Sequence, residues 1–256
     1  MKKIFSAALL TALSLSANAS VTYHIRGTEF TADTLYHAMI GPGTSCTQLL
    51  MRDGGTRQMY VRYSITDLTN PYVMFSAVMG QDSYAGGERV SDMSRRKSRP
   101  GAQYFLGVNG DFFRTSGQSV RGESIVGAPI GPCIADGNIY HGNNHVGNWI
   151  DFTIDVNKRP LFGEATFGGT VTNSKGETVP MGQANSEFAC DQIELFTSTY
   201  ISGTNLGGNC AEVQAVMAEG DAFGIARPFR LVVTSSPSNA GDMDIPAAGY
   251  VIRGQG

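Results

Sequence analysis

The feature that most constrains the fold is a two-residue alternation that follows a glycine turn. Apolar side chains stand at every second position of segment 58–66, namely Met59, Val61, Tyr63 and Ile65. A period of two is that of a β-strand with one buried face. The Asp-Gly-Gly sequence at 53–55 separates this segment from an earlier extended run. The pattern therefore predicts a β-hairpin centred on the glycine turn.

Turns and short strands are predicted for most of the chain. The sequence contains 32 glycines among its 256 residues, together with many Thr, Ser and Asn. Segments 72–79 and 103–108 are predicted as strands, the second of them buried, and Asp136-Gly137 as the turn of a further hairpin. Several more short strands are expected from residue 149 to the C-terminus. The expected fold class is α+β and β-rich, a single domain of mixed or antiparallel sheets with few helices.

One helix is predicted, in the sequence GGERVSDMSRRKSRPG. Val90 and Met93 are three residues apart, a spacing that places both side chains on one helical face. The Pro-Gly pair at 100–101 is a stop signal for the helix.

The first 19 residues have the pattern of a secretory signal peptide. Two lysines precede an apolar run at 4–15, and an Ala-Asn-Ala cleavage site ends the segment at residue 19. The run is shorter than the roughly 20 residues that a membrane-spanning helix needs. The mature chain is therefore expected to be soluble and exported, periplasmic or secreted, without a membrane span. We expect a lead-in segment at 20–32 and one domain at 33–256.

Charge and motifs exclude several classes of function. The net charge is −3, whereas nucleic-acid-binding proteins are usually basic, so no nucleic-acid partner is expected. A G-x-S-x-G nucleophile elbow and a Walker-type phosphate loop are both missing from the sequence. His141 and His145 are four residues apart, but the Gly-Asn-Asn between them disfavours a helix. Neither a metal site nor a cofactor is expected.

The four cysteines leave two interpretations open. Cys190 and Cys210 flank a predicted strand and turn, and a disulfide between them would add on the order of 3 kcal/mol of stability by loop closure. Two buried free thiols are the alternative. Cys46 and Cys133 either pair with each other or remain free.

An Asn-Gly-Asp turn is the main candidate site. Gly110 has no Cβ, so a ligand could approach the backbone closely. Asp111 would bring a carboxylate near guanidinium groups, a combination suited to a substrate with an anionic group. The local sequence alone favours the simpler interpretation, a hairpin turn in which Asp111 caps backbone amides. The charged residues that follow, Arg114, Arg121 and Glu123, are expected within reach of a shared pocket.

The sequence LGVNGDFF resembles the Asn-Gly-(Gly/Asp)-Phe-Phe signature of the phosphodiester glycosidases. These proteins are relatives of the lysosomal uncovering enzyme, which removes N-acetylglucosamine from a phosphodiester. Four other stretches are similar to the family's segments and follow in the expected order within 33–256: VRYSITDLTNPYV, GAPIGPCIADGNI, QIELFTSTYISGTNLGGNCAEV and IPAAGYVIRGQG. The shared order adds more to the resemblance than any one motif.

The resemblance implies hydrolysis of the bond between a sugar's anomeric carbon and a phosphodiester oxygen, without a cofactor. The partner would be a sugar-1-phosphodiester or a phosphorylated glycan. Asp111 would act as base, nucleophile or oxocarbenium stabiliser, and Glu123 as a second carboxylate. Asn109 would orient Asp111 or hold a sugar hydroxyl. Substrate would also contact Gly110 and Arg121. Arg114 would be a second phosphate contact after Arg121.

The sequence departs from the family at its C-terminal end. The family has a later Asp-Gly-Gly-Gly-Ser segment that helps to build the active site, and this sequence stops at Gly256 before it. A C-terminally incomplete domain is therefore expected. The alternative functions are a non-catalytic glycan-binding module of the cell envelope or a truncated inactive relative.

Overall fold

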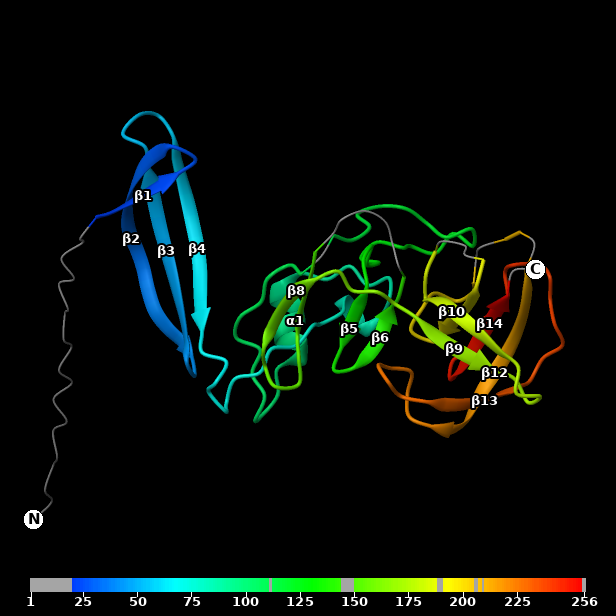
Figure 1. Cartoon of the computed structure of the whole chain (residues 1–256). Helices are drawn as coiled ribbons and strands as arrows, with labels where there is room; N and C mark the ends of the chain where they lie inside the picture. The colour runs from blue at the N-terminus through cyan, green and yellow to red at the C-terminus, as the bar shows by residue number, and fades with distance from the viewer. Residues whose placement is uncertain are drawn as a thin grey trace, which may run out of the picture. The chain divides into compact units, whose positions relative to one another are not determined.

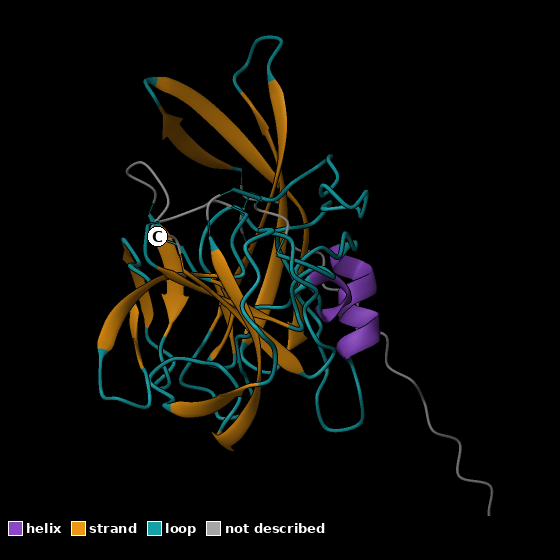
Figure 2. Cartoon of the chain, turned by 90° about the vertical axis from the view of Figure 1, so that its right-hand side faces the viewer, coloured by secondary structure: helices purple, strands orange, loops and turns teal. Residues whose placement is uncertain are grey.

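A computed structural model describes residues 20–110, 112–143, 150–187, 191–204, 207–208 and 210–254. The chain divides into two compact units, Met1–Val73 and Met74–Gly256 (Figure 1). Strands and loops make up nearly all of both units, and the expected β-rich fold class is confirmed (Figure 2). Among the described residues, no helix is long and apolar enough to cross a bilayer.

The first unit is a four-stranded antiparallel sheet in the order β1-β2-β3-β4. Its strands are β1 (Val21–Ile25), β2 (Thr28–Gly41), β3 (Thr44–Arg52) and β4 (Gln58–Thr66). The hairpin between β3 and β4 is confirmed, and Met51 lies opposite Met59 across it. Asp53 stabilises the turn, since its Oδ1 accepts hydrogen bonds from the amides of Gly55 at 2.9 Å and Arg57 at 3.2 Å.

The period-two alternation of β4 places its apolar residues on one face of this sheet. The buried residues of that face are Phe30, Ala32, Leu49 and Met51, with Met59 and Val61 packed against them. Segment 20–32, expected as a lead-in, forms β1 and the first residues of β2. The boundary expected at residue 33 therefore lies inside a strand.

The second unit is built on a six-stranded mixed sheet in the order β13-β12-β14-β11-β10-β9. Its strands are β9 (Gly169–Thr172), β10 (Thr178–Ala184), β11 (Ile193–Thr197), β12 (Ala211–Gly220), β13 (Phe229–Val233) and β14 (Gly249–Gly254). Neighbours pair antiparallel except β10 and β11, which are parallel. Two hairpins complete the unit, β5 (Cys133–Ala135) with β6 (Asn138–His141), and β7 (Asp151–Ile154) with β8 (Pro160–Gly163).

The helical prediction is confirmed by α1 (Val90–Lys97), which follows a short 3-10 turn, η1 (Gly80–Asp82). Arg96 in its last turn is held by two carboxylates, Glu88 at 2.8 Å and Asp82 at 2.6 Å. These ion pairs join the helix to the η1 segment.

Two strand predictions are wrong. Segments 72–79 and 103–108 run as irregular chain, and no described strand pairs with either. The expected burial of 103–108 is also wrong, since Val108 is 79% exposed. Apolar composition is a local property, whereas a strand also needs a neighbouring strand for its backbone hydrogen bonds.

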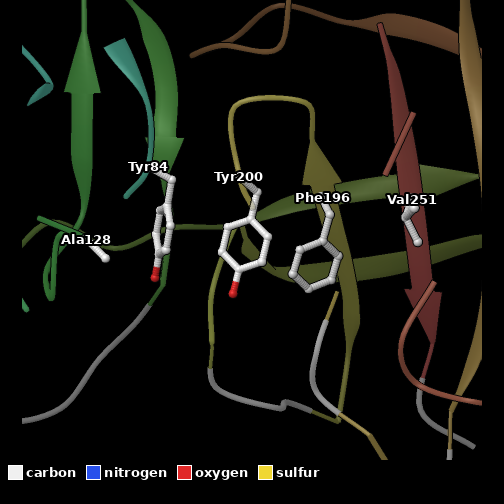
Figure 3. Close-up of a cluster of buried hydrophobic side chains, with 5 residues drawn as sticks. All are labelled: Tyr84, Ala128, Phe196, Tyr200 and Val251. Atoms are coloured by element: carbon white, nitrogen blue, oxygen red, sulfur yellow. The ribbon is translucent and has the colours of Figure 1, made fainter. Parts of the chain in front are cut away.

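The core of the second unit lies against the middle of its sheet. Figure 3 shows its buried side chains, Tyr84, Ala128, Phe196, Tyr200 and Val251. Phe196 comes from β11 and Val251 from the neighbouring β14, and the two residues are paired in register. The other three come from loops, so this core fixes loop segments on the sheet.

Three charged side chains are also buried in this sheet. Arg253 on β14 lies in register with Glu194 on β11 and with Glu212 on β12. Its Nη1 is 2.6 Å from Glu194 Oε2, and its Nε is 3.7 Å from Glu212 Oε1. All three side chains are at most 2% exposed, so their mutual attraction has to offset a large loss of hydration.

Candidate functional site

Two buried tyrosines meet at the turn that follows β11. The turn closes when the Tyr200 amide donates to the Thr197 carbonyl at 3.0 Å. The Tyr84 amide donates to the Thr199 carbonyl at 2.9 Å, which places the two rings with centroids 4.5 Å apart. Figure 3 shows both hydroxyl oxygens directed to the same side.

An ion pair between Arg114 and Glu187 lies close to these tyrosines. Ala128, whose carbonyl binds the Arg114 amide, packs in the same buried cluster as Tyr84 and Tyr200. Arg114 is positioned by its backbone, whose amide donates to the Ala128 carbonyl at 2.9 Å and whose carbonyl accepts from Gly127 at 2.8 Å. The side chains of Arg114 and Glu187 are 37% and 23% exposed, so the pair faces solvent on one side. We call Tyr84, Arg114, Glu187 and Tyr200 the tyrosine–arginine cluster.

Two buried polar atoms of this cluster make no hydrogen bond within the described part of the chain. They are the Tyr84 hydroxyl and Arg114 Nε. Buried polar atoms are nearly always hydrogen-bonded in folded proteins, and each exception needs an explanation. The same property is found for Glu212 Oε1 and Arg253 Nε in the sheet. The cluster therefore has two buried donors that no described residue uses.

The pKa values of both tyrosines are raised well above their usual range. Burial is the main cause for each, and the negative charge of Glu187 adds to it, whereas Arg114 acts in the opposite direction on Tyr84. Both hydroxyls are protonated at neutral pH, as tyrosine hydroxyls normally are, and can donate hydrogen bonds. Two neutral donors, a guanidinium and a carboxylate together suit a bound anionic oxygen next to a proton-transferring group.

Buried amide and imidazole groups hold the surrounding segments in place. His141 Nδ1 donates to the Gly131 carbonyl at 2.7 Å, and its ring lies 5.7 Å from that of Tyr84. Asn185 Nδ2 donates to Thr197 Oγ1 at 2.9 Å, while Asn185 Oδ1 accepts from the Thr197 amide at 2.8 Å. These bonds fix the end of β11, three residues before Tyr200. His145, the other histidine of the sequence pair, lies outside the described residues.

The two arginines that were expected to share a pocket have different partners in the structure. Arg121 Nε is 2.7 Å from Asp242 Oδ1, and Arg121 Nη1 is 2.5 Å from Asp244 Oδ1. Its Nη2 donates to the Asp242 carbonyl at 2.6 Å. Arg114 contacts Glu187 instead, and the two arginines share no partner among the described residues. Arg121 therefore ties its own loop to segment 242–244.

Glu123 has a similar role. Its Oε2 accepts hydrogen bonds from the Ser202 hydroxyl at 2.9 Å and the Ser202 amide at 3.3 Å. Together with Arg121, it fastens loop 119–124 to the segment that follows Tyr200. The structure gives this carboxylate a positioning contact rather than a place in the tyrosine–arginine cluster.

The Asn-Gly-Asp turn is only partly described. Asn109 and Gly110 are exposed, and a Cβ built on Gly110 meets no atom within 4 Å. Neither residue has the positive φ that a two-residue Asn-Gly hairpin requires, so the simple hairpin interpretation does not hold. Asp111 lies outside the described residues.

The expected Cys190–Cys210 disulfide has no support. Cys210 is a buried free thiol close to Arg253, which leaves the alternative of unpaired thiols for this residue. Cys190 lies outside the described residues. Cys46 is also a free thiol.

Tyr84, Glu187 and Tyr200 were not predicted from the sequence. Tyr84 lies just before the Gly-Gly pair at 86–87 and belongs to no motif, and Glu187 lies 73 positions after its partner Arg114. One signal was available for Tyr200, because FTSTY combines the end of a strand with three hydroxyl-bearing neighbours. Such polar strand ends often carry functional side chains.

Comparisons with known proteins show a similarity of fold and indicate no function. No protein-family model matches the chain, and no curated protein matches its sequence. It is similar in structure to a hypothetical protein from Synechocystis, with a TM-score of 0.51 and 16% identity over 94% of this chain and 38% of that one. A protein of Burkholderia pseudomallei K96243, provisionally described as exported, aligns with a TM-score of 0.49 and 17% identity over 82% of this chain and 42% of that one. The chain spans about two fifths of the length of each.

Proposed function

We propose that the protein is an exported hydrolase of sugar-1-phosphodiesters and that the tyrosine–arginine cluster binds the phosphate. The observation that supports this most is the unused donor capacity of a partly exposed arginine, Arg114, next to a carboxylate, Glu187. The Asn-Gly-Asp-Phe-Phe resemblance supplies the substrate class. Export rests on the leader-like residues 1–19.

The chemistry fits these residues. Water would attack the anomeric carbon, the bond from that carbon to the phosphodiester oxygen would break, and a phosphate monoester would leave. Phosphate is a good leaving group, so the demand for a general acid is small compared with that of ordinary glycosidases. Stabilisation of the departing charge matters more, and Arg114 and the Tyr84 hydroxyl are the donors for it.

Two carboxylates take the remaining roles in this proposal. Asp111, three residues before Arg114, acts as base, nucleophile or oxocarbenium stabiliser, as the resemblance implies. Glu187 accepts the proton of the attacking water or orients Arg114 against the phosphate. This assignment replaces Glu123, whose carboxylate is bound to Ser202.

The test is an assay of the full chain on the methyl phosphodiester of N-acetylglucosamine-1-phosphate, with release of the free sugar as the readout. We expect turnover by the wild type and a loss of about 100-fold or more in Asp111→Asn and Glu187→Gln, the size typical of removing one charge-stabilising or acid–base group. Glu123→Gln is the matched control, and it should retain most of the activity.

Two results would contradict the proposal. One is wild-type activity in both carboxylate variants, which would place the chemistry elsewhere. The other is substrate binding with no release of sugar by any form of the protein, which would favour the non-catalytic glycan-binding module.

A further inference from the structure

A hollow lies beside the turn that carries Tyr200. It has a volume of about 270 Å³ and is formed by β6, the turn after β11, the segment around Phe223 and the start of β14. Ser198 and Thr199 line it, whereas the next residue, Tyr200, belongs to the tyrosine–arginine cluster. One turn therefore contributes to two sites.

The lining of this hollow is uncharged. None of its eleven residues is Asp, Glu, Lys or Arg. Arg227 lies outside the lining, and its Nη1 donates to Asn138 Oδ1 at 2.7 Å. An ion that entered the hollow would lose hydration without meeting a charged side chain among the lining residues, which is costly.

The residue types around the hollow combine aromatic rings with hydroxyl groups. Tyr140, Phe223 and Tyr250 provide the rings, and the hydroxyls come from the turn after β11. Phe223 and Tyr250 are both less than 9% exposed, so this wall is rigidly packed. An apolar ring face beside closely spaced hydroxyls suits a molecule with one apolar face and a rim of hydroxyls, such as a sugar ring.

The hydroxyl groups are already oriented. Thr197 Oγ1 and Thr199 Oγ1 are 2.8 Å apart, and Asn185 Nδ2 donates to Thr197 Oγ1 at 2.9 Å. Groups fixed before binding lose little entropy when a ligand arrives. The volume lies just below the range of roughly 300–1,000 Å³ that drug-sized ligands occupy, which indicates one ring rather than a chain.

We propose that this hollow binds a single uncharged sugar ring, as a site separate from the tyrosine–arginine cluster. Sugar binding in this hollow does not require that the protein hydrolyses the sugar, so this proposal is independent of the function proposed above. In a longer glycan, it would hold a neutral ring while the cluster contacts a charged group.

The experiment measures binding of N-acetylglucosamine to the full chain by saturation-transfer NMR and calorimetry. Ala222 and Ala248 line the hollow and are exposed, so Ala222→Trp and Ala248→Trp would fill it without disturbing the core. We expect each variant to weaken binding about tenfold or more, a difference of about 1.4 kcal/mol. The control is Ala240→Trp, an exposed alanine that is not part of the lining, and it should bind as the wild type does.

A charged probe and a cluster variant separate this proposal from the hydrolase proposal. In an Arg114→Met background, N-acetylglucosamine-1-phosphate should bind about tenfold more weakly than the neutral sugar, because the hollow has no cation for its phosphate. The inference fails if the neutral sugar does not bind, if both correctly folded Trp variants bind normally, or if the phosphorylated probe binds as well as the neutral one.

Discussion

Two arginines of the second unit, Arg121 and Arg114, differ in how many of their guanidinium nitrogens have a hydrogen-bond or ion-pair partner. Arg121 has two carboxylates and a backbone carbonyl within 2.7 Å of its nitrogens, and it joins two loops. Arg114 has one carboxylate, Glu187, and a buried Nε that makes no hydrogen bond within the described part of the chain. Both follow the Asn-Gly-Asp turn and carry the same charge, so only their surroundings distinguish them.

This difference indicates which arginine can bind a ligand. A guanidinium that is already neutralised by two carboxylates would have to break those contacts before it could hold a phosphate. A guanidinium with unused donors gains hydrogen bonds when an anion arrives. On the proposed function, Arg121 would therefore have a structural role and Arg114 would bind the phosphate.

The largest effect is expected at a third arginine, Arg253, whose side chain and both carboxylate partners are fully buried. Arg253→Met would leave Glu194 and Glu212 as buried charges without their partner, and we expect a loss of about 3–5 kcal/mol in the free energy of unfolding. Urea denaturation measures it. The control is Arg230→Met, whose pair with Glu219 is exposed and should contribute less than about 1 kcal/mol. Equal losses in the two variants would show that burial does not govern these pairs.

A smaller loss of stability is expected when Arg121 is replaced. Arg121→Met removes hydrogen bonds to charged groups at a partly buried site, and we expect the free energy of unfolding to fall by about 1–2 kcal/mol. Arg114→Met should cost less than about 1 kcal/mol, because Arg114 makes one partly exposed ion pair. Urea denaturation of the two variants side by side tests the contrast. The reverse order would contradict the structural role given to Arg121.

The smallest effect concerns pH. The raised pKa values of Tyr84 and Tyr200 mean that the folded protein holds these protons more tightly than the unfolded chain. Their contribution to stability is therefore complete below about pH 10 and is lost as the pH rises above it. Ultraviolet titration of the ten tyrosines should leave Tyr84 and Tyr200 protonated until the chain unfolds, and Tyr250, whose pKa is also raised by burial, should titrate later than the exposed tyrosines.

Titration of the Glu187→Gln variant tests whether the Glu187 charge raises the pKa of the two tyrosines. Removal of the negative charge should lower the pKa of both tyrosines, because Glu187 contributes to each shift. Glu123→Gln is the control, since its carboxylate is bound to Ser202, and it should leave the titration unchanged. Ionisation of all ten tyrosines near pH 10 in the folded wild type would show that the cluster is not buried as described.

The parts of the fold that were predictable depend on neighbours in the sequence. The β3–β4 hairpin and α1 follow from local periodicity and turn residues, and both are present. Segment 103–108 has strand-like composition but lacks a partner strand, a property that no local pattern contains.

The candidate site was less predictable because its contacts span long distances along the chain. Arg114 was named for its charge and for its place after the turn, but its partner lies 73 residues later. The choice between Arg114 and Arg121 depends on Asp242 and Asp244, which come more than 120 residues after Arg121. Local sequence identifies charged residues, and only tertiary structure shows which of them are already neutralised.

The most direct test of this account compares kcat/KM for the sugar-1-phosphodiester in Arg114→Met and Arg121→Met under conditions in which both variants are folded. The account predicts a loss of about 100- to 1,000-fold for Arg114→Met, the usual size for removing one charge-stabilising donor, and a change of less than about threefold for Arg121→Met. Equal losses in the two variants, or a larger loss for Arg121→Met, would contradict it.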